Sequence, residues 1–389
     1  MSTQSLLTPS LVTKETLVIL ANNLVAAGKV NRQFENQFHK IGSSITVRKP
    51  NRFKAVRGPA LSIQNIAEPS TSITISNQVH IDFQFSSQDL TLTVEEFSER
   101  YLKPAAEELA NVVDFDVLTN FNQVANLVGT PGTVPASFQS LANVGQRMDE
   151  NSVPQDNRVL VLNPAAYWSL ANALVTLFVR SVAEPALKGF IANVANFEIY
   201  QDQNIQSQTV GALGGSPVVN NAGQTGSSLV TNGWTPSITG ILNVGDVISI
   251  AGVNNVNPKN RVSTGSLANF VITAAANSDS GGNSTLQISP AITTTGAYQN
   301  VSGSPANLAP ITVKGSANTA YAQNIGFVKD AFGLVVVPME LPDGVDFRAR
   351  ETVKGLSMRI VRAWDVNNDV FPARMDILYG SATFYQELG

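Results

Sequence analysis

Apolar and polar side chains alternate along the chain from Ile73 to Phe85, which is typical of a strand with one buried face. A strand over these thirteen residues would be about 43 Å long, roughly twice the usual length. Apolar positions at 45–56 predict a partner strand, with a hairpin tip between Gly58 and Pro69. A two-stranded ribbon of this length is marginal in water by itself. We therefore expect the ribbon to lie on a second subunit.

Helical spacing of apolar residues marks one segment on each side of this ribbon. Thr13 is a candidate N-cap of a helix that runs to Gly28, and residues 1–12 are expected to form a loose arm. Pro104 begins a longer helix, which we expect to end near Val128 after about 36 Å. A long helix thus follows a long hairpin.

Helix and strand patterns alternate over residues 136–206. Helices are predicted at 137–148 and from Pro164 through Leu174, and strands at 158–162 and 197–200. This order is typical of a compact α/β or α+β unit. Towards the end of the chain, the patterns predict a buried strand at 334–337 and a long hairpin over 356–379, with Asn367-Asn368 as its turn.

The composition changes sharply at residue 207. Only 14% of the whole chain is charged, against about 25% for an ordinary soluble domain. Residues 207–324 hold just five charged side chains: Asp246, Lys259, Arg261, Asp279 and Lys314. Short strand patterns at 246–251, 270–273 and 285–288, with a turn at Asn283-Ser284, predict an inserted β-barrel or sandwich. The stretch 214–236 has no charge, so its contacts with other subunits would be apolar, around Trp234, or hydrogen-bonded.

Candidates for catalysis or metal binding are few. The absence of cysteine excludes a disulfide scaffold, a thiol nucleophile and a cysteine-based zinc site. The two histidines are His39 and His80, and His80 lies on the polar face of the long strand. Helix-end charge and turn formation account for the remaining acidic candidates, which are Glu95/Glu96, Glu107/Glu108, Asp114/Asp116 and Asp343-Gly344. We therefore predict no catalytic residue, no cofactor-binding residue, no metal ligand and no cofactor.

Basic residues are concentrated at the start of the chain, although the whole chain carries a net charge of −4. Residues 1–58 have a net charge of +7, from Glu15 and Glu35 against Lys14, Lys29, Arg32, Lys40, Arg48, Lys49, Arg52, Lys54 and Arg57. This segment is expected to dock on an acidic region of a neighbouring subunit, such as Glu95–Glu108. Non-specific contact with nucleic-acid phosphates is the alternative. No apolar run approaches the length of a membrane span, and no signal peptide is recognisable, so synthesis in the cytosol is expected.

The order of arm, long hairpin, long helix, α/β unit and closing hairpin resembles that of tailed-phage major capsid proteins with the Hong Kong 97 fold. The resemblance is sharper for coat proteins of short-tailed phages that carry an extra β-barrel. Residues 244–253, Phe270-Val-Ile and 286–291 look like strands of that inserted domain. Residues 162–167, residues 197–204 and Leu378-Tyr-Gly380 are similar to segments before the insertion and to the closing strand.

The resemblance implies an α+β fold of the Hong Kong 97 type with an inserted all-β barrel. The implied divisions are an N-terminal arm (1–40), an extended hairpin or E-loop (41–92), the spine helix and P-domain (93–129), the first part of the A-domain (130–206), the inserted barrel (207–324), the second part of the A-domain (325–355) and the P-domain hairpin (356–389).

The implied function is that of a major capsid protein, without enzymatic activity, that self-assembles into an icosahedral shell around double-stranded DNA. Its implied partners are copies of itself in hexamers and pentamers, a scaffolding protein and a portal, with no membrane. Its place is the virion, after assembly in the host cytoplasm. The main alternative is another virion structural protein, such as a tube or adhesin subunit, and the second is an enzyme. A trimeric β-helical repeat would favour the former alternative, and none is found in the sequence.

Overall fold

The computed structural model describes residues 9–33, 44–64, 68–86, 101–175, 193–345, 347–353 and 355–389. The chain has mixed α/β content and divides into two compact units. The first unit comprises Met1–Val47, Thr71–Leu118 and Phe332–Ala382, and the second comprises Arg48–Ser70, Thr119–Ala331 and Thr383–Gly389.

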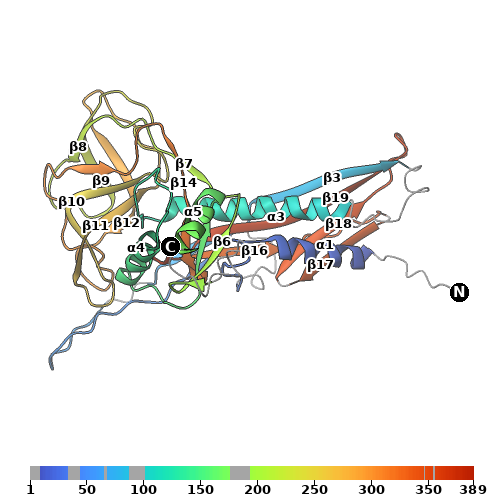
Figure 1. The fold of residues 1–389 in the computed structure, drawn as a ribbon, viewed down its shortest axis with the longest axis horizontal. Helices are drawn as coiled ribbons and strands as arrows, with labels where there is room; N and C mark the ends of the chain where they lie inside the picture. Colours follow the sequence, from blue (N-terminus) through green and yellow to red (C-terminus); the bar gives the residue numbers. More distant parts are fainter. Residues whose placement is uncertain are drawn as a thin grey trace. The chain divides into compact units, whose positions relative to one another are not determined.

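A sheet built around one long strand organises the first unit (Figure 1). The strand β19 (Val370–Thr383) pairs with β18 (Leu356–Arg362), which pairs with β17 (Phe347–Val353). Further strands of this sheet are β16 (Phe332–Val337) and β3 (Asn77–Ser86), which runs antiparallel to β19 over its whole length. The helices α1 (Pro9–Asn23) and α3 (Lys103–Leu118) pack against each other and against strands of this sheet. The predicted hairpin over 356–379 and the buried strand at 334–337 are thereby confirmed.

The alternating segment that predicts one long strand is divided in the structure. Residues up to Thr74 form β2 (Ser70–Thr74), which pairs with β1 (Ser44–Arg48), whereas β3 pairs with β19 of the same chain. The break follows Ser76, and Asn77 is the one odd-numbered position in the alternation without an apolar side chain. The prediction that the whole ribbon lies on a second subunit is therefore wrong for Asn77–Ser86, because β19 offers a full-length partner. It stays a prediction for residues 49–64, which form no strand.

Both helices of the first unit differ from their predicted limits. The helix α1 begins at Pro9, not at Thr13, because proline fits the first helical turn, where its missing N–H is not needed. Residues 9–12 are thus helical and do not form a loose arm. The helix α3 ends at Leu118, not near Val128, and a 3-10 turn, η3 (Thr119–Gln123), follows. The sequence of that turn, Thr-Asn-Phe-Asn-Gln, is rich in side chains that compete with helical hydrogen bonds.

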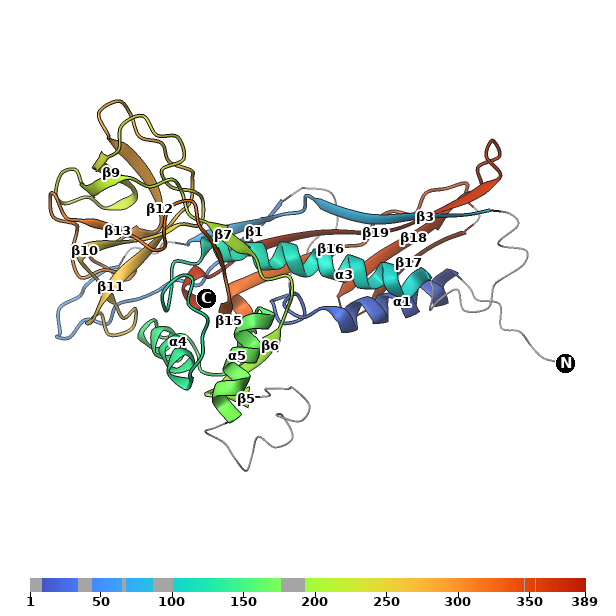
Figure 2. The same ribbon diagram turned by 45° about the horizontal axis from the view of Figure 1, so that its top comes forward.

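The second unit contains the predicted α/β segment (Figure 2). Its four-stranded sheet has the order β15 (Ile325–Val328), β4 (Arg158–Leu162), β6 (Phe197–Gln201) and β5 (Asn193–Val194), with β4 parallel to β6. The helices α4 (Phe138–Glu150) and α5 (Pro164–Val175) share its core, which includes Leu141, Leu170 and Phe197. The Ser137 hydroxyl caps α4 by accepting a hydrogen bond from the Ser140 N–H. These elements confirm the strands and helices predicted for this segment.

Six further strands of the second unit form a nearly closed β-barrel. Their order in the sheet is β13 (Ile311–Val313), β10 (Val247–Val256), β11 (Ser263–Ile272), β12 (Ser284–Ile292), β9 (Gly226–Trp234) and β8 (Gly215–Val219). The two edges meet where Val218 bridges Pro310 and the Val219 N–H donates to the Ala309 carbonyl at 3.0 Å. The interior holds Leu229, Phe270 and Leu286, all fully buried. The three strands predicted most clearly lie in β10, β11 and β12.

A short pair of strands joins the barrel to the rest of the second unit. The strand β7 (Ser207–Thr209) pairs antiparallel with β14 (Ala320–Ala322). These strands lie at the two ends of the segment for which the composition predicts an insertion. The turn before β12 is closed by a hydrogen bond from the Gly282 N–H to the Asp279 carbonyl at 3.1 Å, next to the predicted Asn283-Ser284. An all-β insert is thus confirmed, while its limits at 207 and 324 stay a prediction.

Candidate assembly surface

The histidines and the acidic pairs considered for chemistry are not gathered into one site. His80 is exposed on β3, and its Nδ1 lies 3.0 Å from Oδ2 of Asp82. His39, Glu95 and Glu96 lie outside the described residues. Within the described ranges, no group of three or more acidic or histidine side chains has the geometry to hold a metal ion.

The acidic residues near the C-terminal end of α3 support the fold of the first unit. Asp114 is buried and accepts backbone N–H groups of Val25 at 2.7 Å and Ala27 at 2.6 Å, which hold the end of α1 onto α3. Asp116 accepts the Tyr379 hydroxyl at 2.5 Å and the Asn77 amide at 3.1 Å. Burial, together with the Asp116 carboxylate, raises the pKa of Tyr379. Both carboxylates are therefore used in packing.

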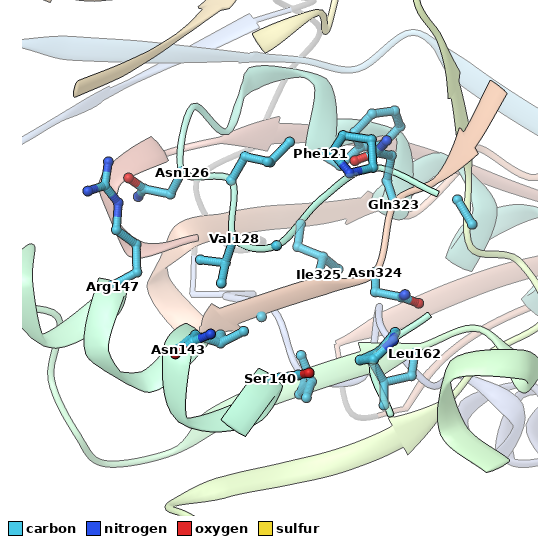
Figure 3. Close-up of a pocket in the computed structure, with 18 of the residues that line it drawn as sticks. Phe121, Asn126, Val128, Ser140, Asn143, Arg147, Leu162, Gln323, Asn324 and Ile325 are labelled. Atoms are coloured by element: carbon cyan, nitrogen blue, oxygen red, sulfur yellow. The ribbon is translucent and has the colours of Figure 1, made fainter. Parts of the chain in front are cut away.

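A cavity of about 290 Å³ lies within the second unit (Figure 3). Its wall is mixed, with apolar side chains such as Val128 and Ile325 beside polar ones such as Asn143, and Arg147 lies at one edge. Burial lowers the pKa of Arg147, whose guanidinium donates to Ser266 at 3.0 Å and lies 3.5 Å from Glu150. Among the described residues, those that line the cavity include no Asp, Glu or His side chain.

Two barrel residues singled out in the sequence, Asp246 and Trp234, are buried. Asp246 is buried and accepts N–H groups of Asn243 at 2.7 Å and Gly211 at 3.0 Å, so it is not a surface charge. Trp234 is also buried, and its indole N–H donates to the Thr231 hydroxyl at 2.8 Å. The expected apolar contact between subunits around Trp234 is therefore wrong: the uncharged stretch 214–236 forms β8 and β9, and its indole fills the barrel core.

The most exposed apolar side chains lie together on one extended segment. Residues 49–64, which we call the assembly arm, contain Leu61 at 88% and Ile63 at 83% exposure. Phe53 and Val56 are also largely exposed. The Gln64 side chain joins the two limbs of the arm, since it accepts the Lys54 N–H at 2.8 Å and donates to the Lys54 carbonyl at 2.5 Å. Apolar groups this exposed, on a segment without secondary structure, are typical of a surface that another chain covers.

An exposed acidic surface lies on α3 in the first unit. Glu107 and Glu108 are exposed there, and they fall between the half-exposed aromatic rings of Tyr101 and Phe115. We call these four residues the α3 outer face. The opposite side of the helix is buried, for example at Leu109 and Val113, so these four side chains can be reached by another subunit, as can the exposed Lys103 at the start of the helix.

Several of the basic residues near the start of the chain have partners in their own unit. Arg48 pairs with Glu68 at 3.1 Å, Arg52 pairs with Glu387, and Arg32 donates to the Ala27 carbonyl. Lys40 lies outside the described residues. Some of the basic residues of 1–58 are therefore engaged in contacts within their own unit. The exposed ones include Lys54 and Arg57 on the assembly arm.

Comparison with known proteins identifies the family. The family model described as "P22 coat protein - gene protein 5" matches residues 1–389. Among solved structures, one from Mycobacterium phage Che8 is 14% identical and covers 94% of this chain and 89% of its own, with a TM-score of 0.50. The capsid of Ralstonia phage GP4 is 9% identical over 91% and 82%, with a TM-score of 0.44. The CUS-3 coat protein I-domain is 23% identical over 27% and 97%, with a TM-score of 0.19.

No match was found among the curated proteins. Within the part of the chain that the structure describes, no helix has the length and apolar character to cross a membrane. The structural likeness to the Che8 protein supports the predicted fold, and the whole-chain family match decides between a capsid protein and the tube or adhesin alternative. The chain belongs to the P22 coat protein family, and it is a phage major capsid protein that forms the shell.

Proposed function

We propose that the shell is held together by the assembly arm of one copy, which lies on the α3 outer face of a second copy. The observation that carries this proposal is the exposure of Leu61 and Ile63. Covering an aliphatic side chain of this size contributes about 1.5–3 kcal/mol. A contact that recurs at every subunit accumulates this gain over the particle.

Charge and shape support the α3 outer face as the receiving surface. The arm carries Lys54 and Arg57 beside its apolar side chains, whereas α3 presents Glu107 and Glu108. Tyr101 and Phe115 supply flat apolar area on the same face, since each is 48% exposed. Opposite charges steer the encounter and set the register, and the apolar contacts supply most of the free energy.

The family and the order of elements along the chain support a proposal for the wider assembly. We propose hexamers and pentamers of this chain in an icosahedral shell around double-stranded DNA, assembled in the host cytoplasm with a scaffolding protein and a portal. We also propose that the protein has no enzymatic role. The family is structural, and the buried Asp114 and half-buried Asp116 of α3 are engaged in packing contacts. We also propose the division of the chain into N-terminal arm, E-loop, spine helix, A-domain, inserted barrel and P-domain, with the residue limits that the resemblance implies.

A charge exchange between the two surfaces tests the arm contact. Lys54→Glu with Arg57→Glu, or Glu107→Lys with Glu108→Lys, should each lower the yield of shells, because like charges then meet. The combination of all four changes should restore the yield. Lys259→Glu with Lys329→Glu is the matched control, since both lysines are exposed elsewhere in the second unit. Sedimentation and electron microscopy measure the yield, and circular dichroism checks folding. If the combined variant assembles no better than either double variant, the pairing is wrong.

A further inference from the structure

The root of the assembly arm lies among cationic and aromatic side chains that come from three parts of the second unit. Arg52 Cζ lies 5.8 Å from the ring centroid of Tyr298, and Lys49 Nζ lies 5.1 Å from that of Tyr385. Arg52 also pairs with Glu387. Tyr298 follows the barrel strand β12, whereas Tyr385 and Glu387 belong to the last segment of the chain, around the 3-10 turn η5 (Gln386–Leu388). We call these five residues the root cluster.

Polar contacts tie the same segments together. The Arg52 N–H donates to the Tyr298 hydroxyl at 3.4 Å, which is near the limit for a hydrogen bond. The Ser289 hydroxyl, in barrel strand β12, donates to the Gln386 side chain at 2.7 Å. The barrel and the last segment are thus bonded to each other as well as to the arm. Figures 1 and 2 show the arm leaving this region as an extended blue trace.

The root cluster is partly shielded from water. The side chains of Arg52 and Glu387 are 38% and 32% exposed, and burial lowers the pKa of Lys49. Cation–π contacts gain strength when water is partly excluded, so the two cations hold the arm more firmly than exposed pairs would. The outer arm differs, since Leu61 and Ile63 are almost fully exposed. The arm is therefore anchored at its root and open along its length.

We infer that the inserted barrel holds the assembly arm in place, with Tyr298 as the positioning residue. The aromatic ring of Tyr298 receives the Arg52 guanidinium and fixes the direction in which the arm leaves the second unit. This assigns the insert a role in assembly that acts through the arm. The effect on shells rests on the proposed arm contact, whereas the hold on the arm is a property of the single subunit.

The rate of trypsin cleavage in the arm measures how firmly the barrel holds the root of the arm. The two bonds compared are the one after Arg52, in the root, and the one after Arg57, in the open arm. Trypsin can also cleave after Arg48 and Lys54, whereas the Lys49–Pro50 bond resists it. In the soluble subunit, Tyr298→Ala should raise the cleavage rate after Arg52 about fivefold, the equivalent of about 1 kcal/mol, relative to the rate after Arg57. Tyr298→Phe, which keeps the ring, should change that ratio less than about twofold. Val262→Ala, an exposed barrel site, is the control.

A second variant tests the anchor of the arm without altering the barrel, in case Tyr298→Ala disturbs the folding of the barrel. Glu387→Gln removes the ion pair with Arg52 and should raise the same ratio about twofold. An unchanged ratio in Tyr298→Ala would overturn the inference, and a rise in Glu387→Gln alone would then show that the last segment, not the barrel, holds the arm. If the ratio rises in Tyr298→Ala but shells form as in the unaltered protein, the barrel does hold the arm, and it is the proposed arm contact that is wrong.

Discussion

Tyr379 is the residue whose substitution has the most clearly defined effect on the first unit. Its side chain is fully buried, and its hydroxyl donates to Asp116 of α3, so it joins the longest strand of the sheet to that helix. Tyr379→Phe removes this hydrogen bond and leaves Asp116 with the weaker contact from Asn77 at 3.1 Å. Hydrogen bonds to charged groups contribute about 1.5–3 kcal/mol, and the free energy of unfolding should fall by that amount at neutral pH.

The cost of this substitution should depend on pH. The pKa of Tyr379 is raised in the folded protein, first by burial and then by the hydrogen bond and charge of Asp116. Above about pH 10 the unfolded tyrosine loses its proton while the folded one keeps it, so the free energy of unfolding falls as the pH rises. At pH 11 this lowers the contribution of Tyr379 by about 1.4 kcal/mol. The difference between the unaltered protein and Tyr379→Phe should shrink by the same amount.

Urea unfolding of the soluble subunit at pH 7.5 and pH 11, followed by circular dichroism, measures both effects. Tyr101→Phe is the matched control, since Tyr101 belongs to the same unit and is 48% exposed. The difference in free energy of unfolding between the unaltered protein and Tyr379→Phe should be smaller at pH 11 than at pH 7.5. A difference that stays the same or grows would refute the reasoning, because Tyr379 would then ionise as easily in the folded as in the unfolded chain.

Two further substitutions test the packing of the two units. Trp234→Ala should lower the free energy of unfolding in urea by about 3–5 kcal/mol, because it empties part of the barrel core. Trp168→Ala is the control and should lower it by less than about 1 kcal/mol, since that side chain is 54% exposed. Equal losses would contradict the placement of Trp234. Asp114→Ala should lower the free energy of unfolding by about 2–4 kcal/mol and speed hydrogen exchange in α1 and in residues 24–28, since the buried Ala27 N–H and the partly buried Val25 N–H lose their acceptor. Unchanged exchange there would show that Asp114 does not hold α1.

Local patterns in the sequence predict most elements of the fold but not which strands pair. The alternation between Ile73 and Phe85 correctly marks strand residues, and Val79, Ile81 and Phe83 are half-buried as the period requires. The pattern does not reveal that β3 pairs with β19, because the two strands are nearly 300 residues apart in the chain. Pairing over such a distance depends on the whole first unit and not on local propensity.

The candidate assembly surface was only partly predictable, for similar reasons. The charge of residues 1–58 directs attention to a segment that includes the arm, but a count of charges does not separate Arg48, which pairs with Glu68, from Arg57, which is exposed. Trp234 lies in an uncharged, turn-rich stretch that resembles a loop, and only the closure of the barrel places its ring inside. The root cluster brings together residues near 50, 298 and 386, for which no local signal exists.

A reconstruction of the assembled particle by electron cryo-microscopy would show where the assembly arm lies. We predict shells in which residues 53–63 of one copy lie on α3 of an adjacent copy, with Lys54 or Arg57 near Glu107 or Glu108. The claim would be contradicted by particles in which the arm extends into solvent or lies on its own subunit, and equally by a protein that stays a compact monomer with and without a scaffolding protein.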